Sequence, residues 1–349
     1  MDNFQFLVIF SVTLVLLFMG AFRWLPQEQW QMLATLPTSK ANQTTWRGLN
    51  LTYYGFLTAC AVSFAVGLFF ILMGTLSISI SATVQLAAIL LGITVPMAKL
   101  IAKYVEKKPH TFTIGGSSFV GIVLAPLAIF FLNWVHAPSS AGIPLMPALA
   151  SLWISFAFGE GLGRLACLSF GCCYGKPLHS CHPFVQKFFA RIHVRFTGMT
   201  KKAAYESGLE SIPLLPIQAL TAMVNTIAGF IGLILFLNTQ FTLAIIETTV
   251  VTQGWRVISE FMRADHRGQR TFSAYQLMAL LSIAYSLSLL PLWPSPSTTK
   301  PSIFDGLTMV WNPAFVLSLQ ILWMSIFLFT GRSQVTHSTI EFYVRKDRI

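Results

Sequence analysis

The sequence predicts an all-α polytopic membrane protein with about nine transmembrane helices. The chain has 349 residues, of which 54% are hydrophobic and only 10% are charged, whereas a soluble chain carries about 25% charged residues. Long apolar runs recur along it, each close to the roughly 20 residues that cross the hydrocarbon of a bilayer. A segment surrounded by lipid must satisfy its own backbone hydrogen bonds, so we expect each run to be a helix.

In chain order, the apolar runs cover residues 4–22, 50–74, 82–102, 113–135, 146–165, 214–237, 242–262, 273–292 and 312–331. We expect the first run to be a retained helix, because it lacks the basic start and the cleavage site of a signal peptide. With no internal repeat, residues 1–349 are interpreted as one membrane domain with a polar insert at 166–213. Within that insert, residues 200–210 are compatible with a short amphipathic helix, and the proline-rich residues 293–311 indicate a surface loop.

Positive charge is distributed unevenly between the two sets of connections. The net charge is +11, and the basic residues gather in 23–49, 99–112, 164–213, 263–272 and the tail after 331. Lys300 is the one basic residue in the connections on the opposite side. The positive-inside rule then predicts an inner-membrane protein with its N-terminus outside and with its C-terminus and polar insert in the cytoplasm.

Two groups of charged residues lie inside or at the ends of the apolar runs, where charge is costly and marks a site or a buried pair. Glu160 and Arg164 are four residues apart and share a helix face. A polar stripe on one later helix consists of Gln253, Arg256, Glu260 and Arg263. Intrahelical salt bridges are one interpretation. The other is that two arginines converge on an anion such as a lipid phosphate, which a planar guanidinium binds well.

Three further polar features are less specific. Tyr53 and Tyr54 begin a helix, where interfacial aromatic residues are common. Gly115 and Gly116 lie at the start of another helix, whose amide groups offer a generic anion cradle. Asn225 is expected to form a hydrogen bond between helices.

Five cysteines are present, and most lie near the stretch GRLACLSFGCCYGKP at 163–177. Cys60 is expected to be a small buried residue. For Cys167, Cys172 and Cys173 the favoured role is packing in a glycine turn. Three alternatives stay open: a metal site of non-standard spacing, a disulfide if this loop is external, and a thiol nucleophile activated by nearby cations. The residues that these alternatives would add are Arg164, Lys176, His179, Cys181 and His182.

An ordered set of motifs resembles the prolipoprotein diacylglyceryl transferase family. The motifs are YYGF at 53–56, TIGGSSFVG at 113–121, GRLACLSFGCCYGKP at 163–177, LPIQAL at 215–220, GWRVISEFMRADH at 254–266 and FSAYQLMALLSI at 272–283. The resemblance covers about 50–292 and leaves the helices at 4–22 and 312–331 outside.

The resemblance implies an enzyme of lipoprotein biosynthesis that moves a diacylglyceryl group from phosphatidylglycerol to a cysteine thiol and releases glycerol phosphate. The catalytic residues it implies are Tyr54, Arg164, Arg256 and Glu260. The residues it implies for binding the lipid phosphate are Gly115, Gly116, Arg164, Gln218, Arg256 and Arg263. The expected partners are a phosphatidylglycerol-like lipid, the bilayer and an acceptor that the sequence does not identify. We expect no cofactor, no metal and no nucleic acid. The alternative is a lipid-binding or lipid-transport protein that kept the phosphate pocket.

The sequence also departs from the family pattern. Polar or acid–base residues of the family are replaced by Ile114, Cys167, Phe170, Cys172, Leu215 and Leu220. The general base must therefore come from elsewhere, with His179, His182 and Glu260 as candidates. The charge distribution also places the signature loop inside, whereas the family's signature faces outside. One extra N-terminal crossing would invert the core, so we expect the protein to use an acceptor on the cytoplasmic side.

Overall fold

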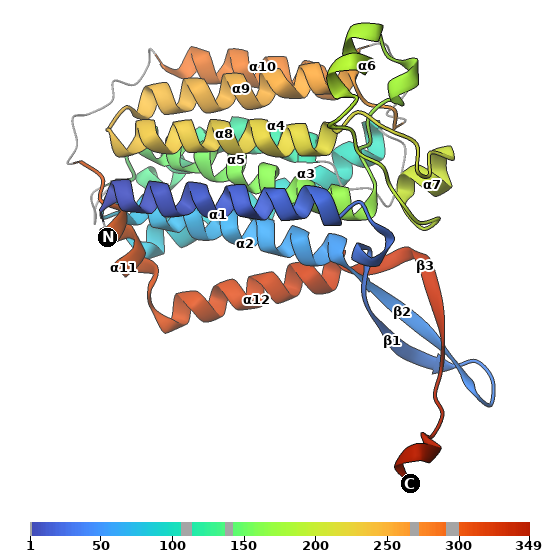
Figure 1. The fold of residues 1–349 in the computed structure, drawn as a ribbon. Helices are drawn as coiled ribbons and strands as arrows, with labels where there is room; N and C mark the ends of the chain where they lie inside the picture. Colours follow the sequence, from blue (N-terminus) through green and yellow to red (C-terminus); the bar gives the residue numbers. More distant parts are fainter. Residues whose placement is uncertain (1, 106–113, 137–141, 266–271, 291–299) are drawn as a thin grey trace.

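The computed structural model describes residues 2–105, 114–136, 142–265, 272–290 and 300–349. Within these residues, nine long helices run side by side (Figure 1). They are α1 (Asn3–Trp24), α2 (Tyr53–Gly74), α3 (Ile80–Val105), α4 (Ile114–His136), α5 (Leu145–Phe170), α8 (Ile217–Leu237), α9 (Phe241–Phe261), α10 (Ala274–Leu289) and α12 (Pro313–Thr330). The helical polytopic architecture that the sequence predicts is confirmed.

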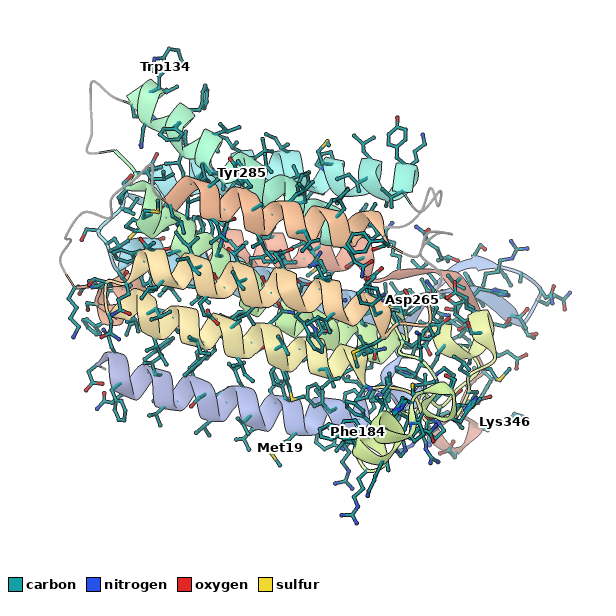
Figure 2. All side chains as sticks on the ribbon, turned by 90° about the horizontal axis from the view of Figure 1, so that it is seen from above. Met19, Trp134, Phe184, Asp265, Tyr285 and Lys346 are labelled. Carbon is teal, nitrogen blue, oxygen red and sulfur yellow. The ribbon has the colours of Figure 1, made fainter. Side chains whose placement is uncertain are left out.

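Seven of these helices are long and apolar enough to cross a membrane. The exceptions are α9, which carries Glu247, Arg256 and Glu260, and α10, which has only 16 residues. Side chains such as Met19 and Trp134 point away from the bundle and are 68% and 76% exposed (Figure 2). An apolar surface of this kind is suited to lipid rather than water.

Helix α5 is the most buried of the seven apolar helices. It packs most closely on α2 and α8, and small residues allow the close approach. A Cβ atom on Gly161 would lie 2.5 Å from the hydroxyl oxygen of Thr226, and one on Gly229 would lie 2.9 Å from the ring of Phe158. Since lipid provides no hydrophobic drive between helices, close packing of this kind is what stabilises their association.

A three-stranded antiparallel sheet projects from one end of the bundle (Figure 1). Its order is β1 (Met32–Lys40), β2 (Thr45–Thr52) and β3 (Arg332–Glu341), with Leu49 of β2 opposite both Leu36 and His337. The sequence did not predict this sheet. It joins the two ends of the chain, because the amide of Thr52 donates to the carbonyl of Gly331 at 2.9 Å.

The polar insert lies at the same end as the sheet, and the N-terminus lies at the opposite end (Figure 1). It carries the short helices α6 (Pro183–Phe189) and α7 (Lys202–Ser207). Helix α7 confirms the short helix expected within 200–210. The insert begins later than predicted, because α5 continues to Phe170 and ends at Gly171, whose φ of 74° is left-handed.

The prediction of a loop over 293–311 is wrong for its second half. Helix α11 (Ile303–Val310) occupies it, and the hydroxyl of Ser302 accepts a hydrogen bond from the amide of Asp305. This N-cap offsets the helix-breaking effect of the prolines before it. Four of the basic residues used for the topology, Lys107, Lys108, Arg267 and Arg270, lie outside the described residues.

Candidate functional site

Three of the family-like motifs meet through backbone hydrogen bonds at the insert end of the bundle. The amide of Lys176 donates to the carbonyl of Met262, and the amide of Ala264 donates to that of Tyr174, both at 3.0 Å. The amide of Leu215 donates to the carbonyl of Lys176 at 3.0 Å. The loop after α5 is therefore fixed against the end of α9 and the start of α8.

Two arginines from different helices converge on Glu160, deep in the bundle. Arg256 on α9 donates through Nη2 to both carboxylate oxygens of Glu160, each at 2.6 Å. Arg164 on α5 donates through Nη2 to Oε1 at 2.6 Å. The side chains are 3% exposed for Glu160, 12% for Arg164 and 10% for Arg256. The predicted intrahelical pair of Glu160 and Arg164 is present, and the convergence of two arginines is present as well.

The start of α4 completes the surroundings of Arg256. Its Nη1 donates to the hydroxyl of Ser118 at 3.2 Å. A Cβ atom on Gly115 would lie 2.8 Å from that same Nη1 and 3.0 Å from the ring of Tyr275. Glycine at this position therefore makes room for the guanidinium. Gly116 faces α3 instead, where a Cβ atom would lie 2.6 Å from Ile101.

Arg263 lies just past the end of α9 and is paired with Asp265. The two side chains form a bidentate contact, Nε to Oδ1 at 2.8 Å and Nη2 to Oδ2 at 2.7 Å. Arg263 is attracted electrostatically by Glu260 and Cys173, and it lies close enough to Arg164 for the two positive charges to repel each other. Arg256, a member of the polar stripe predicted along α9, binds Glu160 on the neighbouring helix α5.

Tyr54 and Gln218 both lie beside the turn that follows α5. Tyr54 packs against Phe170, with ring centroids 5.6 Å apart, and interacts electrostatically with Arg164. Gln218 donates through Nε2 to the carbonyl of Cys172 at 2.8 Å. Its amide thus holds the turn in place. Asn225, expected to bond between helices, donates to the carbonyl of Thr221 on its own helix at 3.0 Å.

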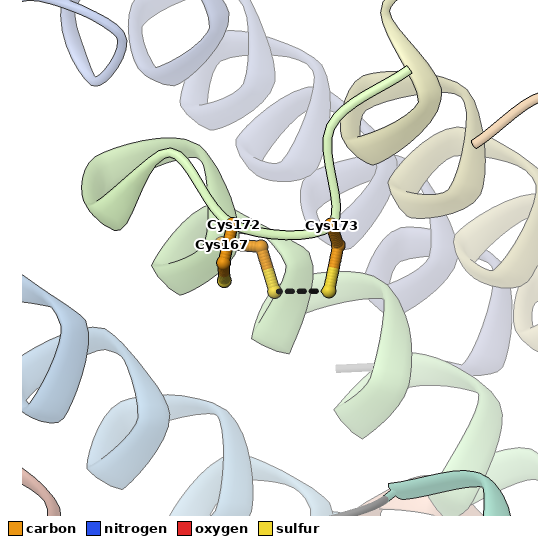
Figure 3. A group of neighbouring side chains, drawn as sticks. All are labelled: Cys167, Cys172 and Cys173. Atoms are coloured by element: carbon orange, nitrogen blue, oxygen red, sulfur yellow. Dashed lines mark hydrogen bonds between the residues drawn. The ribbon is translucent and has the colours of Figure 1, made fainter. Parts of the chain in front are cut away.

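The cysteines of the signature form a compact group (Figure 3). The sulfur atoms of Cys167, Cys172 and Cys173 lie within 4.8 Å of one another, and no disulfide joins the five cysteines, all of which are described. Hydrogen bonding with the other two thiols, together with burial, raises the pKa of Cys172 well above its ordinary value. This shift is opposite to the one that a thiol nucleophile requires. Cys181 lies apart, with its thiol donating to the carbonyl of Pro177 at 3.5 Å.

The two histidines considered as bases, His179 and His182, are exposed on the insert. The ring of His182 accepts a hydrogen bond from the amide of Phe184 and so caps α6.

Sequence reasoning missed three residues that shape this region. Ser118 and Asp265 bind the arginines but lie within motifs chosen for other residues. Lys201 is fully buried and donates to the carbonyls of Leu25 and Ser169 at 3.1 and 2.6 Å. Burial lowers the pKa of Lys201 to about 7. No sequence pattern in a polar insert distinguishes a buried lysine from an exposed one, so Lys201 could not be singled out in advance.

A family model described as prolipoprotein diacylglyceryl transferase matches residues 43–292, which is most of the chain. The chain belongs to the prolipoprotein diacylglyceryl transferase family. No curated protein and no solved structure matches it. Membership supports a diacylglyceryl transferase in the membrane, with a lipid donor and a protein acceptor. Helices α1 and α12 and strands β1 and β3 lie outside the matched residues, whereas every candidate site residue lies inside.

Proposed function

We propose that the protein transfers a diacylglyceryl group from an anionic glycerophospholipid of the phosphatidylglycerol kind, with Arg164 and Arg256 holding the lipid phosphate. The supporting observation is that both guanidinium groups retain an unused donor. Among the described residues, the Nε atoms of Arg164 and Arg256 are buried and have no hydrogen-bond partner. A buried donor without an acceptor costs about 1–3 kcal/mol. Phosphate oxygens are acceptors that match the guanidinium geometry.

Glu160 has a positioning role in this proposal. Its carboxylate holds both guanidinium groups at 2.6 Å and fixes their separation. It neutralises one of the two positive charges, so the three side chains together carry one net positive charge. A phosphodiester carries one negative charge and would complete the balance. Glu160 therefore lowers the free-energy cost of burying two arginines in the membrane, and one positive charge remains to attract a lipid phosphate.

The proposed step is a displacement at the glycerol carbon that bears the phosphate. The acceptor nucleophile forms a bond to that carbon, the carbon–oxygen bond breaks, and the electron pair stays on the leaving oxygen. The leaving glycerol phosphate gains a negative charge, which the arginines stabilise in the transition state. We propose that Glu260 is the general base that accepts the proton of the acceptor. We assign to Tyr54, which lies beside Arg164, a supporting polar role in the same site.

We further propose that the acceptor is on the cytoplasmic side. The proposal is supported by the charge distribution and by the extra crossing of α1 before the family-like helices. Substituted-cysteine labelling at Ser180, an exposed residue of the insert, tests it in intact cells. Labelling only after permeabilisation is expected, and labelling of intact cells by a membrane-impermeant reagent would overturn the inversion.

The enzymatic proposal is tested with purified protein in liposomes that contain phosphatidylglycerol labelled in its headgroup, with cell lysate as the source of acceptor. We expect release of labelled glycerol phosphate. Arg256→Lys keeps the charge but loses the bidentate geometry, and we expect its rate to fall by roughly 100-fold. Arg345→Lys, at a side chain that is 66% exposed, is the matched control and is expected to keep the rate.

A second candidate is a lipid-binding protein without chemistry. Ile114, Cys167 and Cys172 replace polar or acid–base residues of the family, and this observation favours it. In the same liposome experiment, binding of phosphatidylglycerol without any release of glycerol phosphate would support the binder and contradict the enzyme.

A further inference from the structure

The three signature thiols form a second candidate site beside the arginines. Cys167 lies on the last turn of α5, and Cys172 and Cys173 follow on the turn after it (Figure 3). The sulfur atoms of Cys167 and Cys173 are 4.0 Å apart, and all three lie within 4.8 Å of one another. Among the described residues, no other group of three histidine, cysteine or acidic side chains brings its ligand atoms this close.

The chain fixes these thiols through its backbone. The amides of Gly171 and Cys172 both donate to the carbonyl of Cys167, at 2.8 and 3.2 Å. Gly171 and Cys173 both have positive φ angles, 74° and 56°. The amide of Gln218 on α8 holds the carbonyl of Cys172 from the other side. The positions of the three thiols are therefore set by the fold, and a ligand needs only small side-chain adjustments.

The chemistry of this donor set selects one class of ligand. Three sulfur atoms with no oxygen donor among them suit thiophilic ions such as Zn²⁺ and exclude Mg²⁺ and Ca²⁺, which prefer oxygen. Tetrahedral Zn²⁺ with Zn–S bonds of about 2.3 Å places its sulfurs about 3.8 Å apart, slightly closer than the separations seen here. Three thiolates and one Zn²⁺ carry one net negative charge, and Arg164 and Arg263 both interact electrostatically with Cys173.

We propose that Cys167, Cys172 and Cys173 bind one thiophilic metal ion, with Zn²⁺ as the natural candidate. Three protein ligands leave the fourth tetrahedral position open, as in zinc sites that receive an exogenous ligand. The site differs from the metal alternative considered for the sequence, which included His179, Cys181 and His182. Its three ligands are not among the residues assigned to the phosphate, so metal binding can be measured without the proposed lipid chemistry.

The experiment measures Zn²⁺ and Co²⁺ binding to the full chain, purified in detergent under reducing conditions. We expect one ion per chain and a thiolate-to-cobalt charge-transfer band. Cys167→Ser and Cys172→Ser should weaken binding by roughly 100-fold. Cys60→Ser and Cys181→Ser, which remove cysteines outside the group, should bind as the unaltered chain does. Equal binding by all four variants, or cobalt bound without a thiolate band, would overturn the site.

A second measurement needs no variant and so does not depend on folding of the substituted chains. The unaltered protein is treated with a thiol reagent with and without Zn²⁺, and the labelled peptides are identified by mass spectrometry. Protection confined to Cys167, Cys172 and Cys173 supports the site. Unchanged labelling of these three in the presence of Zn²⁺ contradicts it.

Discussion

Replacing Glu160 by glutamine removes the negative charge that Arg164 and Arg256 share while keeping the shape of the side chain. Glu160 is 3% exposed and makes three contacts of 2.6 Å to the two guanidinium groups. Removing one partner of a buried ion pair leaves an uncompensated charge and costs about 3–5 kcal/mol. We expect a loss of unfolding free energy in this range, measured by titration with a denaturing detergent in mixed micelles.

The matched control is Glu206→Gln, which breaks another ion pair between residues four apart. Its contact to Lys202 is 3.7 Å long, and the two side chains are 28% and 24% exposed. Solvent screens such a pair, so we expect a loss of about 0–1 kcal/mol. If Glu160→Gln costs no more than this control, the three side chains do not form a buried charge cluster, and the argument for the phosphate site fails with it.

Two further predictions concern stability and are measured in the same titration. Gly55→Ala should lower the unfolding free energy by about 1–3 kcal/mol, because its Cβ atom would clash with the backbone of Gly331. The control is Gly92→Ala, which is also in a helix but has open space around it, and it should be neutral or stabilising. Equal effects of the two substitutions would refute the close approach of Gly55 and Gly331. Burial lowers the pKa of Lys201 to about 7 in the folded state. Between this pH and the ordinary lysine pKa, the unfolded chain therefore keeps a proton that the folded chain has lost. Stability should then rise between about pH 7 and pH 10.5, by at most about 1.4 kcal/mol per pH unit, and a profile unchanged in Lys201→Met would show that another group is responsible.

The helices could be predicted from the sequence because lipid requires each apolar run to form one. The sheet could not, because β3 is largely polar and β1 contains Pro37, so neither shows the regular apolar alternation of a half-buried strand. Strands β2 and β3 also pair between residues as distant as Thr45 and Glu341. No local pattern reports pairing across such a separation. The helix over 303–310 was missed because the prolines before it favour a loop, while its N-cap signal from Ser302 is a single residue.

For the candidate site, the sequence identified Arg164 and Arg256 but not the carboxylate between them as their common partner. The spacing of Glu160 and Arg164 shows that they share a face of α5. The depth at which α9 packs against α5 decides whether Arg256 reaches the same carboxylate, and that depth depends on contacts made along the whole interface. Similarly, the spacing of the cysteines did not show that Cys167 joins the pair at 172–173 and that Cys181 does not.

The most direct test of the central claim is glycerol phosphate release by Arg256→Lys in phosphatidylglycerol liposomes, compared with Arg345→Lys and the unaltered chain. If Arg164 and Arg256 hold the lipid phosphate, release falls by roughly 100-fold in Arg256→Lys alone, while its unfolding free energy shows that the bundle is intact. Equal rates of release in all three proteins would contradict the assignment of the phosphate to these arginines.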